Sequence, residues 1–295
     1  MKFITNTSDL AKFLNKKIKF NSLIKSISTD TRSLKKNSLF IAIKGENFDG
    51  NDFVDEALSK GSNIIIADNK LFKKNKIKRI IWVNDSIKAL KTISHNIIKD
   101  YGGNVIAITG SNGKTTTTNI IAKTLKNNSK TLKNFNNEIG MPLSLMDASS
   151  KSKNLIFEIG ASKLNDIDYL SKILQPNVGL ITNIENSHLE SLKNIDGVFK
   201  VKSEIVKNIK KNGFLVVPND NKKHLNKWKK MRSDITTISF GMKDDSDFYP
   251  IDVKIKQNGL SFLVTSRLLE KSIKISSSLE LSLIHISEPT RLIGI

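Results

Sequence analysis

The 295-residue chain has no cysteine, which excludes disulfide bonds and thiolate metal sites. It has no apolar run approaching the ~20 residues of a membrane-spanning helix. The residues after Met1 lack the apolar core of a signal peptide. The apolar fraction of 38% suits a globular protein, and the length allows two domains with their own cores. We therefore expect a cytoplasmic monomer that does not insert into membranes.

Arginine is scarce: only five of the 48 basic residues are arginine, although the net charge is +20. The lysines are spread along the whole chain, and asparagine and isoleucine are also abundant, so the charge reflects a general compositional bias. A nucleic-acid interface needs basic residues gathered on one surface. We predict no nucleic-acid binding, although a basic surface would still favour an anionic substrate.

The first part of the chain is typical of a small α/β domain. Strands are predicted over residues 38–43 and 63–67, and helices over residues 51–60 and 85–99. Asp85 is the predicted N-cap of the second helix, and Gly61 is placed to end the first. Residues 101–104 break the pattern, which places the predicted domain boundary between residues 1–102 and residues 103–280.

After this boundary, predicted strands and helices alternate. The strands are 105–109, 155–158, 178–183 and 213–218, and the helices are 114–125, 166–174 and 198–210. Such alternation predicts a parallel sheet with helices on both faces, in which ligands bind at the carboxyl ends of the strands. From residue 251 the pattern changes to strands around Asn258-Gly259, a dipeptide typical of β-hairpins. The chain is therefore assigned to the α/β class.

A phosphate-binding loop is the strongest single motif. The predicted strand 105–109 is followed by Gly110, Ser111, Asn112, Gly113, Lys114, Thr115 and Thr116, and then by a helix. Glycines let backbone N–H groups approach phosphate oxygens, Lys114 reaches the β- and γ-phosphates, and the Thr115 hydroxyl ligates magnesium. Ile108 stands where the longer P-loop pattern has glycine, so the match is to Gly-x-x-Gly-Lys-Thr. We predict binding of ATP and Mg²⁺, against the alternative of a glycine turn that only caps a helix.

Residues 109–116 resemble the ATP loop of the Mur ligases, which build the peptide stem of the bacterial cell-wall precursor. Further segments match in the same order: 28–32 and 39–46 before the loop, and 134–143, 157–162, 181–184, 188–190 and 201–205 after it. The resemblance runs from residue 25 to residue 265. Within the family, residues 136–142 favour the branch that joins D-alanyl-D-alanine to UDP-N-acetylmuramoyl-tripeptide over the sister branch that adds the third amino acid.

The resemblance implies ATP-driven amide synthesis, in which the tripeptide carboxylate becomes an acyl phosphate and the amine of D-alanyl-D-alanine displaces phosphate. It implies that Glu158 and His188 bind magnesium together with Thr115. Lys202 matches the lysine that the family carries as a carbamate, which forms from a neutral amine and also holds metal. Lys200 is the competing candidate for that lysine. The expected catalytic residues are Lys114, His188 and Lys202.

The UDP-sugar substrate is expected in the first domain. By resemblance, its residues there are Thr31, Arg32, Lys44, Gly45 and Glu46, and Asn136, Asn137 and Ser162 are expected where the substrate meets ATP. The Arg32 guanidinium suits a phosphate or a carboxylate, and the alternative for it is a structural salt bridge.

Two other functions stay open at this point: a Mur-type amide ligase that adds a single amino acid, and a nucleotide-binding fragment without ligase chemistry. The family has three domains, and the third receives the amine substrate. Residues 281–295 match nothing in the family and resemble translated adapter sequence. We therefore expect a foreign tail, a truncated central domain, no C-terminal ligase domain and no ligase activity in this chain alone, against the alternative of a divergent C-terminus.

Overall fold

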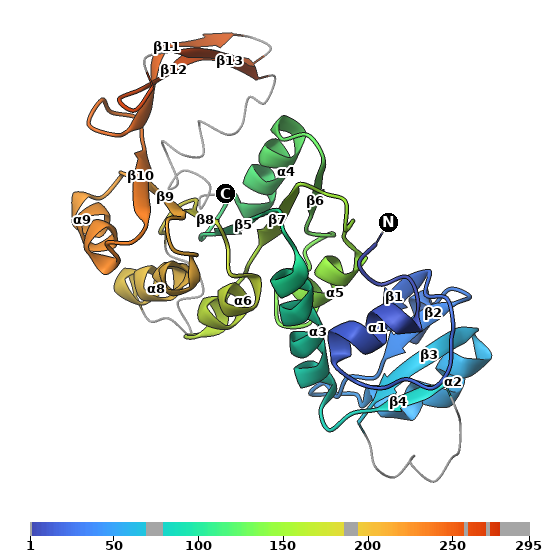
Figure 1. The fold of residues 1–295 in the computed structure, drawn as a ribbon. Coiled ribbons are helices and arrows are strands. Elements are labelled where there is room, and N and C mark those ends of the chain that lie inside the picture. The colour runs from blue at the N-terminus through green and yellow to red at the C-terminus, as the bar shows by residue number, and fades with distance from the viewer. Residues whose placement is uncertain (1, 69–78, 186–193, 257–258, 270–271, 278–295) are drawn as a thin grey trace, which may run out of the picture. The chain divides into compact units, whose positions relative to one another are not determined.

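The computed structural model describes residues 2–68, 79–185, 194–256, 259–269 and 272–277. Contacts divide the chain into two compact units, Met1–Leu215 and Val216–Ile295. The first unit holds a four-stranded sheet and a second sheet that carries the phosphate loop (Figure 1). None of the helices in the described ranges is long and apolar enough to cross a membrane.

The four-stranded sheet of the first unit is parallel throughout. Its order is β1 (Ser26–Ser28), β2 (Ser38–Ile41), β3 (Ser62–Ala67) and β4 (Ile80–Trp82). The short helix α2 (Val54–Ser59) packs on this sheet, and its Ala57 shares a buried cluster with Phe40 and Ile65. Helix α1 (Thr7–Leu14) begins at Asn6, whose side chain accepts hydrogen bonds from the first backbone N–H groups of the helix.

Helix α3 (Ser86–Asp100) confirms the predicted helix 85–99. Asp85 is its N-cap and accepts a hydrogen bond from the N–H of Lys88 at 2.9 Å. Leu90, Ile93 and Ile97 are fully buried, as their spacing on one helix face predicts. The helix packs against α1 and against two helices that accompany the second sheet. It therefore contacts both parts of the first unit.

We expect Asp85→Ala to lower the free energy of unfolding by about 1 kcal/mol, because one N–H of the first turn loses its acceptor. Urea unfolding of the chain measures the change. Lys88→Ala is the matched control, because it removes the exposed ion pair with Asp85 at 3.7 Å and leaves the cap. Equal losses in both variants would show that the ion pair, not the cap, carries the effect.

The second sheet of the first unit is also parallel, which confirms the predicted α/β arrangement. Within this unit its order is β8 (Val178–Ile181), β5 (Asn104–Thr109), β7 (Asn154–Glu158) and β6 (Asn128–Lys130). Ile106, Ile108 and Ile156 pack against apolar side chains of α4 (Lys114–Thr124). Because these strands are parallel, the segments that follow β5, β7 and β8 all leave from one edge of the sheet.

The structure corrects several predicted boundaries. The predicted helix 198–210 is two elements, α8 (Ile195–Lys202) and the 3-10 helix η4 (Ser203–Asn208). The predicted helix 51–60 begins as the 3-10 helix η2 (Gly50–Phe53) before it becomes α2. Helix α6 (Asp166–Leu174) has the predicted bounds. Strand β6 and helix α5 (Gly140–Asp147) were not predicted, because β6 is short and polar and α5 is buried on nearly all sides without a polar face.

The second unit is described by itself. Strand β9 (Phe214–Pro218) spans the division, and α9 (Lys222–Met231) and β10 (Thr236–Phe240) follow. Strands β11 (Phe248–Lys256), β12 (Gly259–Ser266) and β13 (Ile273–Ser277) form an antiparallel meander. Lys256 pairs with Gly259, which confirms the predicted hairpin, whereas Asn258 lies outside the described residues.

Candidate active site

The phosphate loop lies between β5 and α4, as predicted. Gly110 has φ +146° and Gly113 has φ +77°, backbone conformations that favour glycine. A Cβ atom on Gly110 would lie 1.9 Å from Thr182 Oγ1, so only glycine fits there. The first N–H groups of α4 have no acceptor within the helix, and together with the helix dipole they form an anion-binding end at the carboxyl edge of the sheet.

Lys114 is folded back over this loop. Its Nζ donates to the carbonyl oxygen of Gly110 at 2.8 Å and to that of Ser111 at 3.1 Å. Burial lowers the pKa of the Lys114 amine, and the nearby Glu158 carboxylate opposes that change. The ammonium group is thus held over the turn that the sequence assigns to phosphate.

Glu158 ends β7 and is 1% exposed. Its Oε2 accepts a hydrogen bond from Thr115 Oγ1 at 2.8 Å, and its backbone N–H donates to Thr131 Oγ1 at 2.8 Å. Among the described atoms, Glu158 Oε1 is buried without a hydrogen-bond partner. A buried carboxylate oxygen without a partner is costly, and a carboxylate beside a hydroxyl is a donor set that suits Mg²⁺. Thr115 and Glu158 therefore fit a divalent cation.

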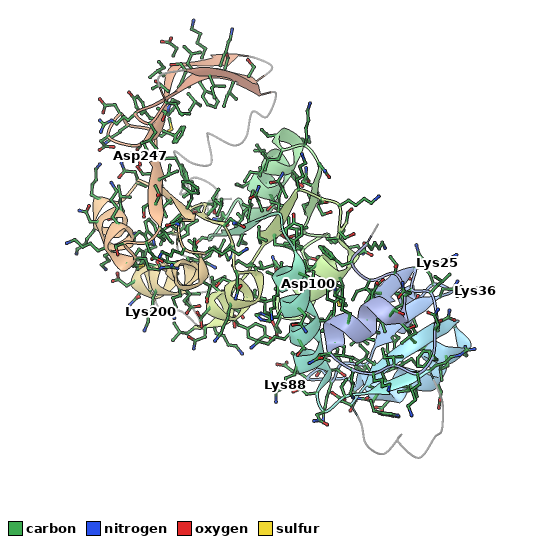
Figure 2. The ribbon with its side chains drawn as sticks, viewed as in Figure 1. Lys25, Lys36, Lys88, Asp100, Lys200 and Asp247 are labelled. Carbon is green, nitrogen blue, oxygen red and sulfur yellow. The ribbon has the colours of Figure 1, made fainter. Side chains whose placement is uncertain are left out.

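Lys202 ends α8 and is 1% exposed, which is unusual for lysine. Burial lowers the pKa of its amine to about 8; neighbouring Lys114 adds to this effect, and Asp166 and Glu204 oppose it. At pH 7 about one such amine in ten is neutral, against roughly one in three thousand for an ordinary lysine. Lys200, labelled in Figure 2, is exposed. Burial therefore favours Lys202 over Lys200 as the candidate for the lysine that the family carries as a carbamate.

Two acidic residues shape the segment between β7 and α6. Glu204 is 3% exposed, and its two carboxylate oxygens accept the N–H groups of Asn165 at 2.8 Å and Asp168 at 3.1 Å. Asn165 has φ +71°, a left-handed conformation that asparagine tolerates. Asp166 Oδ2 accepts the backbone N–H of Ser162 at 2.9 Å and its hydroxyl at 3.2 Å. Ser162 is therefore held in place by the first turn of α6.

The two asparagines expected between substrate and ATP have different surroundings. The carbonyl of Asn136 accepts the N–H of Gly160 at 2.7 Å, and a Cβ atom on Gly160 would lie 3.0 Å from Asn136 Oδ1. Asn136 thus lies beside the segment that follows Glu158. The side chain of Asn137 accepts the N–H of Gly140 at 2.8 Å, where α5 begins. The structure gives Asn137 a role in the start of that helix.

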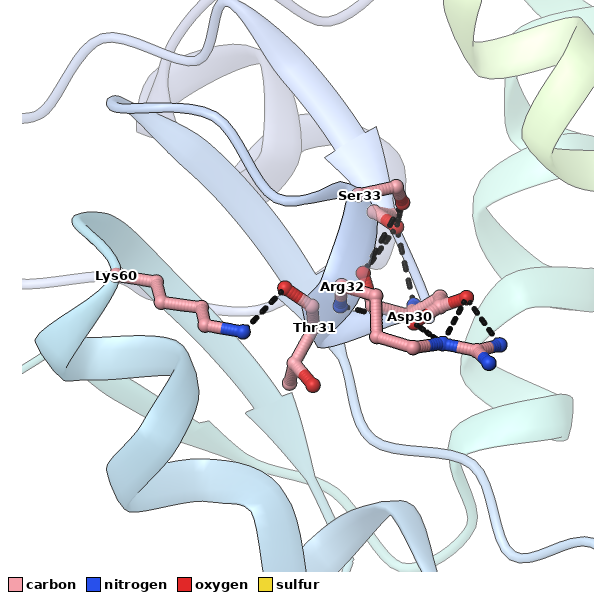
Figure 3. A network of polar contacts seen from close by, with 6 residues as sticks. Asp30, Thr31, Arg32, Ser33 and Lys60 are labelled. Carbon is pink, nitrogen blue, oxygen red and sulfur yellow. Dashed lines mark hydrogen bonds and ion pairs between the residues drawn. The ribbon is translucent and has the colours of Figure 1, made fainter.

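The substrate residues predicted in the first domain follow β1 and β2, which are parallel neighbours, and so lie at one edge of that sheet. Arg32 Nε and Nη2 donate to the Asp30 carboxylate at 2.7–3.1 Å (Figure 3). This bond to Arg32 holds the pKa of Asp30 below its usual value. Thr31 is buried, and its carbonyl oxygen lies 3.4 Å from Lys60 Nζ. The Arg32 side chain is 86% exposed, so its guanidinium remains accessible.

The remaining residues predicted to bind the substrate in the first domain form an exposed turn after β2. Lys44, Gly45 and Glu46 are all exposed, and the N–H of Gly45 donates to the carbonyl of Phe48 at 2.8 Å. An isolated bridge joins Lys44 to Asp49 and closes the turn. The turn therefore presents a positive and a negative side chain to solvent.

Two predicted features lie outside the described residues. These are His188, the expected second metal ligand, and the expected foreign tail, residues 281–295. Within the described ranges, no three histidine, aspartate or glutamate side chains gather in a cluster that would hold a metal. Beside the first turn of α4, the described structure offers the oxygen ligands of Thr115 and Glu158.

Sequence reasoning missed the residues that support the loop from β8. Thr182, Asn183 and Glu185 all hydrogen-bond to residues of the phosphate loop. The signal in the sequence was that residues 181–184, which include Thr182 and Asn183 but not Glu185, form one of the segments that resemble the Mur ligases. Neither spacing nor composition identifies the partners of these side chains, because β8 follows β5 by about seventy residues and meets it only in the folded sheet.

Comparison with known families matches most of the chain to two domains of one family. Residues 108–281, more than half of the chain, match the Mur ligase middle domain, and residues 23–101 match the Mur ligase family, catalytic domain. The chain belongs to the Mur ligase family. The match to the middle domain extends beyond Thr265, where the motif resemblance was expected to fade, and ends at residue 281.

Several curated relatives of this chain share one name. The UDP-N-acetylmuramoyl-tripeptide–D-alanyl-D-alanine ligase of Buchnera aphidicola subsp. Baizongia pistaciae is 39% identical over 246 residues, which are 82% of this chain and 53% of that protein. The crystal structure of MurF from Acinetobacter baumannii has a TM-score of 0.78 and 28% identity, over 88% of this chain and 56% of that one. The MurF ligase of Thermotoga maritima, solved with ADP, has a TM-score of 0.74 and 29% identity, over 85% and 57% of the two chains. The chain spans about half the length of the curated relatives it matches.

Proposed function

We propose that this chain carries the substrate-binding and ATP-binding parts of a ligase that joins D-alanyl-D-alanine to UDP-N-acetylmuramoyl-tripeptide. The observation that carries the proposal is the phosphate loop with Lys114 folded over it, beside the hydrogen-bonded pair of Thr115 and the buried Glu158. The names of the relatives and the ADP in the Thermotoga maritima structure support both the substrates and the nucleotide. We infer a cytoplasmic monomer.

The backbone N–H groups, the glycines and Lys114 of the loop contribute to this reaction in different ways. The N–H groups at the start of α4 bind phosphate oxygens, and the glycines keep side chains out of their way. Lys114 leaves its carbonyl partners and neutralises charge on the β- and γ-phosphates. These contacts let the substrate carboxylate approach a polyanion and stabilise the charge on the transferring phosphoryl group.

Thr115 and Glu158 would hold Mg²⁺, which supplies further neutralisation of the phosphate charge when bound. We also propose that Lys202 is carbamylated and that His188 is a metal ligand. For Lys202, the support is its burial and its lowered pKa, because carbamylation requires a neutral amine. For His188 the support is the resemblance of residues 188–190 to the family segment.

The substrates are assigned to two segments of the chain, and their identity follows from the family branch. We propose that residues 1–102 bind the UDP-sugar, with Arg32 pairing with a phosphate or carboxylate after it exchanges its bond to Asp30. Residues 103–280 bind ATP. The edge at which Thr31, Arg32 and the turn of Lys44 to Glu46 lie supports the first assignment.

Two measurements test the proposal. The first is the affinity of the chain for ATP and for UDP-N-acetylmuramoyl-tripeptide, and we expect both to bind. The second supplies UDP-N-acetylmuramoyl-tripeptide, ATP and labelled amines to this chain extended by the C-terminal domain of a relative. We expect label from D-alanyl-D-alanine in the product. Incorporation of a single amino acid, with D-alanyl-D-alanine unused, would overturn the choice of branch.

We expect Glu158→Gln to raise the Mg²⁺ concentration needed for half-maximal nucleotide binding roughly tenfold or more, because an amide oxygen is a weaker ligand than a carboxylate. A titration of MgCl₂ at fixed nucleotide measures the change. Asp55→Asn, which removes an exposed carboxylate from α2, is the control for lost negative charge. An unchanged Mg²⁺ response in Glu158→Gln would remove Glu158 from the metal site.

A further inference from the structure

The segment that follows β8 is bound to the outer side of the phosphate loop. Its backbone contributes first: the N–H of Thr182 donates to the carbonyl of Thr109 at 2.9 Å, and the N–H of Ser111 donates to the carbonyl of Asn183 at 3.3 Å. Thr182 Oγ1 also donates to the carbonyl of Asn112 at 2.6 Å. The start of the loop is therefore attached to a second strand of the sheet as well as to its own.

Two side chains of this segment complete the attachment. Asn183 Oδ1 accepts the backbone N–H of Asn112 at 2.9 Å, and Asn183 Nδ2 donates to Glu185 Oε1 at 3.0 Å. Glu185 Oε2 accepts from Asn112 Nδ2 at 2.8 Å. Asn112, Asn183 and Glu185 thus form a closed ring of hydrogen bonds, to which Asn112 contributes its backbone N–H and its side-chain amide. We call Asn183 and Glu185 the loop clamp.

The backbone of Glu185 adds a further tie to the loop. Ser111 Oγ donates to the carbonyl of Glu185 at 2.9 Å, and the N–H of Glu185 donates to Ser111 Oγ at 3.0 Å. Both residues between the two glycines of the loop are consequently bound to the clamp segment. In the described ranges, no ion pair involves Glu185, and its carboxylate accepts hydrogen bonds from the two asparagine amides.

The clamp divides the donors of the loop into two groups. The N–H groups of Ser111 and Asn112 are used by Asn183, whereas those of the first turn of α4 have no acceptor within the helix. A loop of small and polar residues with two glycines would otherwise lose conformational entropy when it binds phosphate. Holding it in one conformation beforehand lowers that cost and raises affinity.

We propose that Asn183 and Glu185 are positioning residues that hold the phosphate loop in its binding conformation and thereby set its affinity for the phosphate groups of the nucleotide. This inference rests on the proposed function, because it takes the loop to be the nucleotide site. Neither side chain needs to touch the nucleotide. Both act through Asn112 and the backbone of the loop.

The test compares the affinities of the 295-residue chain for ADP and for adenosine, which lacks the phosphates. We expect Asn183→Ala and Glu185→Ala each to weaken ADP binding about tenfold and to leave adenosine binding within about twofold. Because the two residues act as one unit, the double variant should lose little more than either single variant. Glu185→Gln keeps one acceptor and should lie between the wild type and Glu185→Ala.

Asn104→Ala is the matched control. It removes an exposed asparagine pair, Asn104 with Asn154, from the amino end of β5, the strand that precedes the phosphate loop, and should leave ADP affinity unchanged. Unchanged ADP affinity in the clamp variants, an equal loss for adenosine, or tighter ADP binding in Glu185→Gln would each overturn the inference. Thermal unfolding identifies a variant that fails to fold, and Glu185→Gln then decides by the same comparison. Failure of the wild-type chain to bind ADP would instead refute the proposed function.

Discussion

We expect Lys114→Ala to abolish ATP-dependent activity in the complete enzyme and to weaken nucleotide binding by this chain roughly a hundredfold or more. The Lys114 ammonium is held by two carbonyl oxygens of the loop, and it is placed to neutralise the phosphates that bind there. Removal of this charge leaves the backbone N–H groups and the proposed Mg²⁺ site to bind the phosphate oxygens, without the side-chain cation. Calorimetry or displacement of a fluorescent nucleotide measures the affinity, and release of phosphate measures the activity.

Two controls test whether the expected loss is specific to the Lys114 ammonium group. Lys123→Ala removes an exposed lysine from the same helix and should leave nucleotide affinity within about twofold, because exposed charges interact weakly through water. Binding of UDP-N-acetylmuramoyl-tripeptide by Lys114→Ala should be largely retained, since that site is proposed in residues 1–102. Turnover at the wild-type rate by Lys114→Ala would refute the assignment of the phosphate loop.

The second large effect is expected for Lys202→Ala, which should reduce activity of the complete enzyme by a factor of about a hundred or more. If Lys202 acts as a carbamate, the variant loses an anionic oxygen ligand that no neighbouring side chain replaces. Formate or acetate should then partly restore activity, because a small carboxylate fits the space left by the side chain. The measurement is the rate as a function of added acid at constant ionic strength.

Lys200 supplies the matched control, since it lies two residues away on α8 and is exposed (Figure 2). Lys200→Ala should keep activity within about twofold, with or without added acid. Because Lys202 is buried, its truncation also leaves a cavity, and thermal unfolding of Lys202→Ala separates that cost from the loss of chemistry. Full activity of Lys202→Ala without any acid would remove Lys202 from the site.

Local sequence patterns were sufficient to predict the elements whose ends are set by neighbouring residues. Asp85 as the N-cap of α3, the bounds of α6 and the strand–loop–helix around Lys114 were all predictable, because capping, apolar spacing and glycine placement act within a few residues. The same reasoning failed at α8, which a 3-10 helix follows at Ser203. The apolar spacing continues there, so the sequence pattern does not mark the change to the 3-10 helix, which packs against α6.

The sequence by itself determined the chemistry on offer: a phosphate loop, a strand that ends in Glu158, and a lysine at position 202. It did not determine which side chains meet. The burial of Lys202 is a property of the folded chain. The contact of Thr115 with Glu158 and the clamp of Asn183 and Glu185 on Asn112 join residues separated by tens of positions. Only the parallel pairing of β5 with β7 and β8 brings those residues to one edge, because strand order is decided by the packing of the whole sheet.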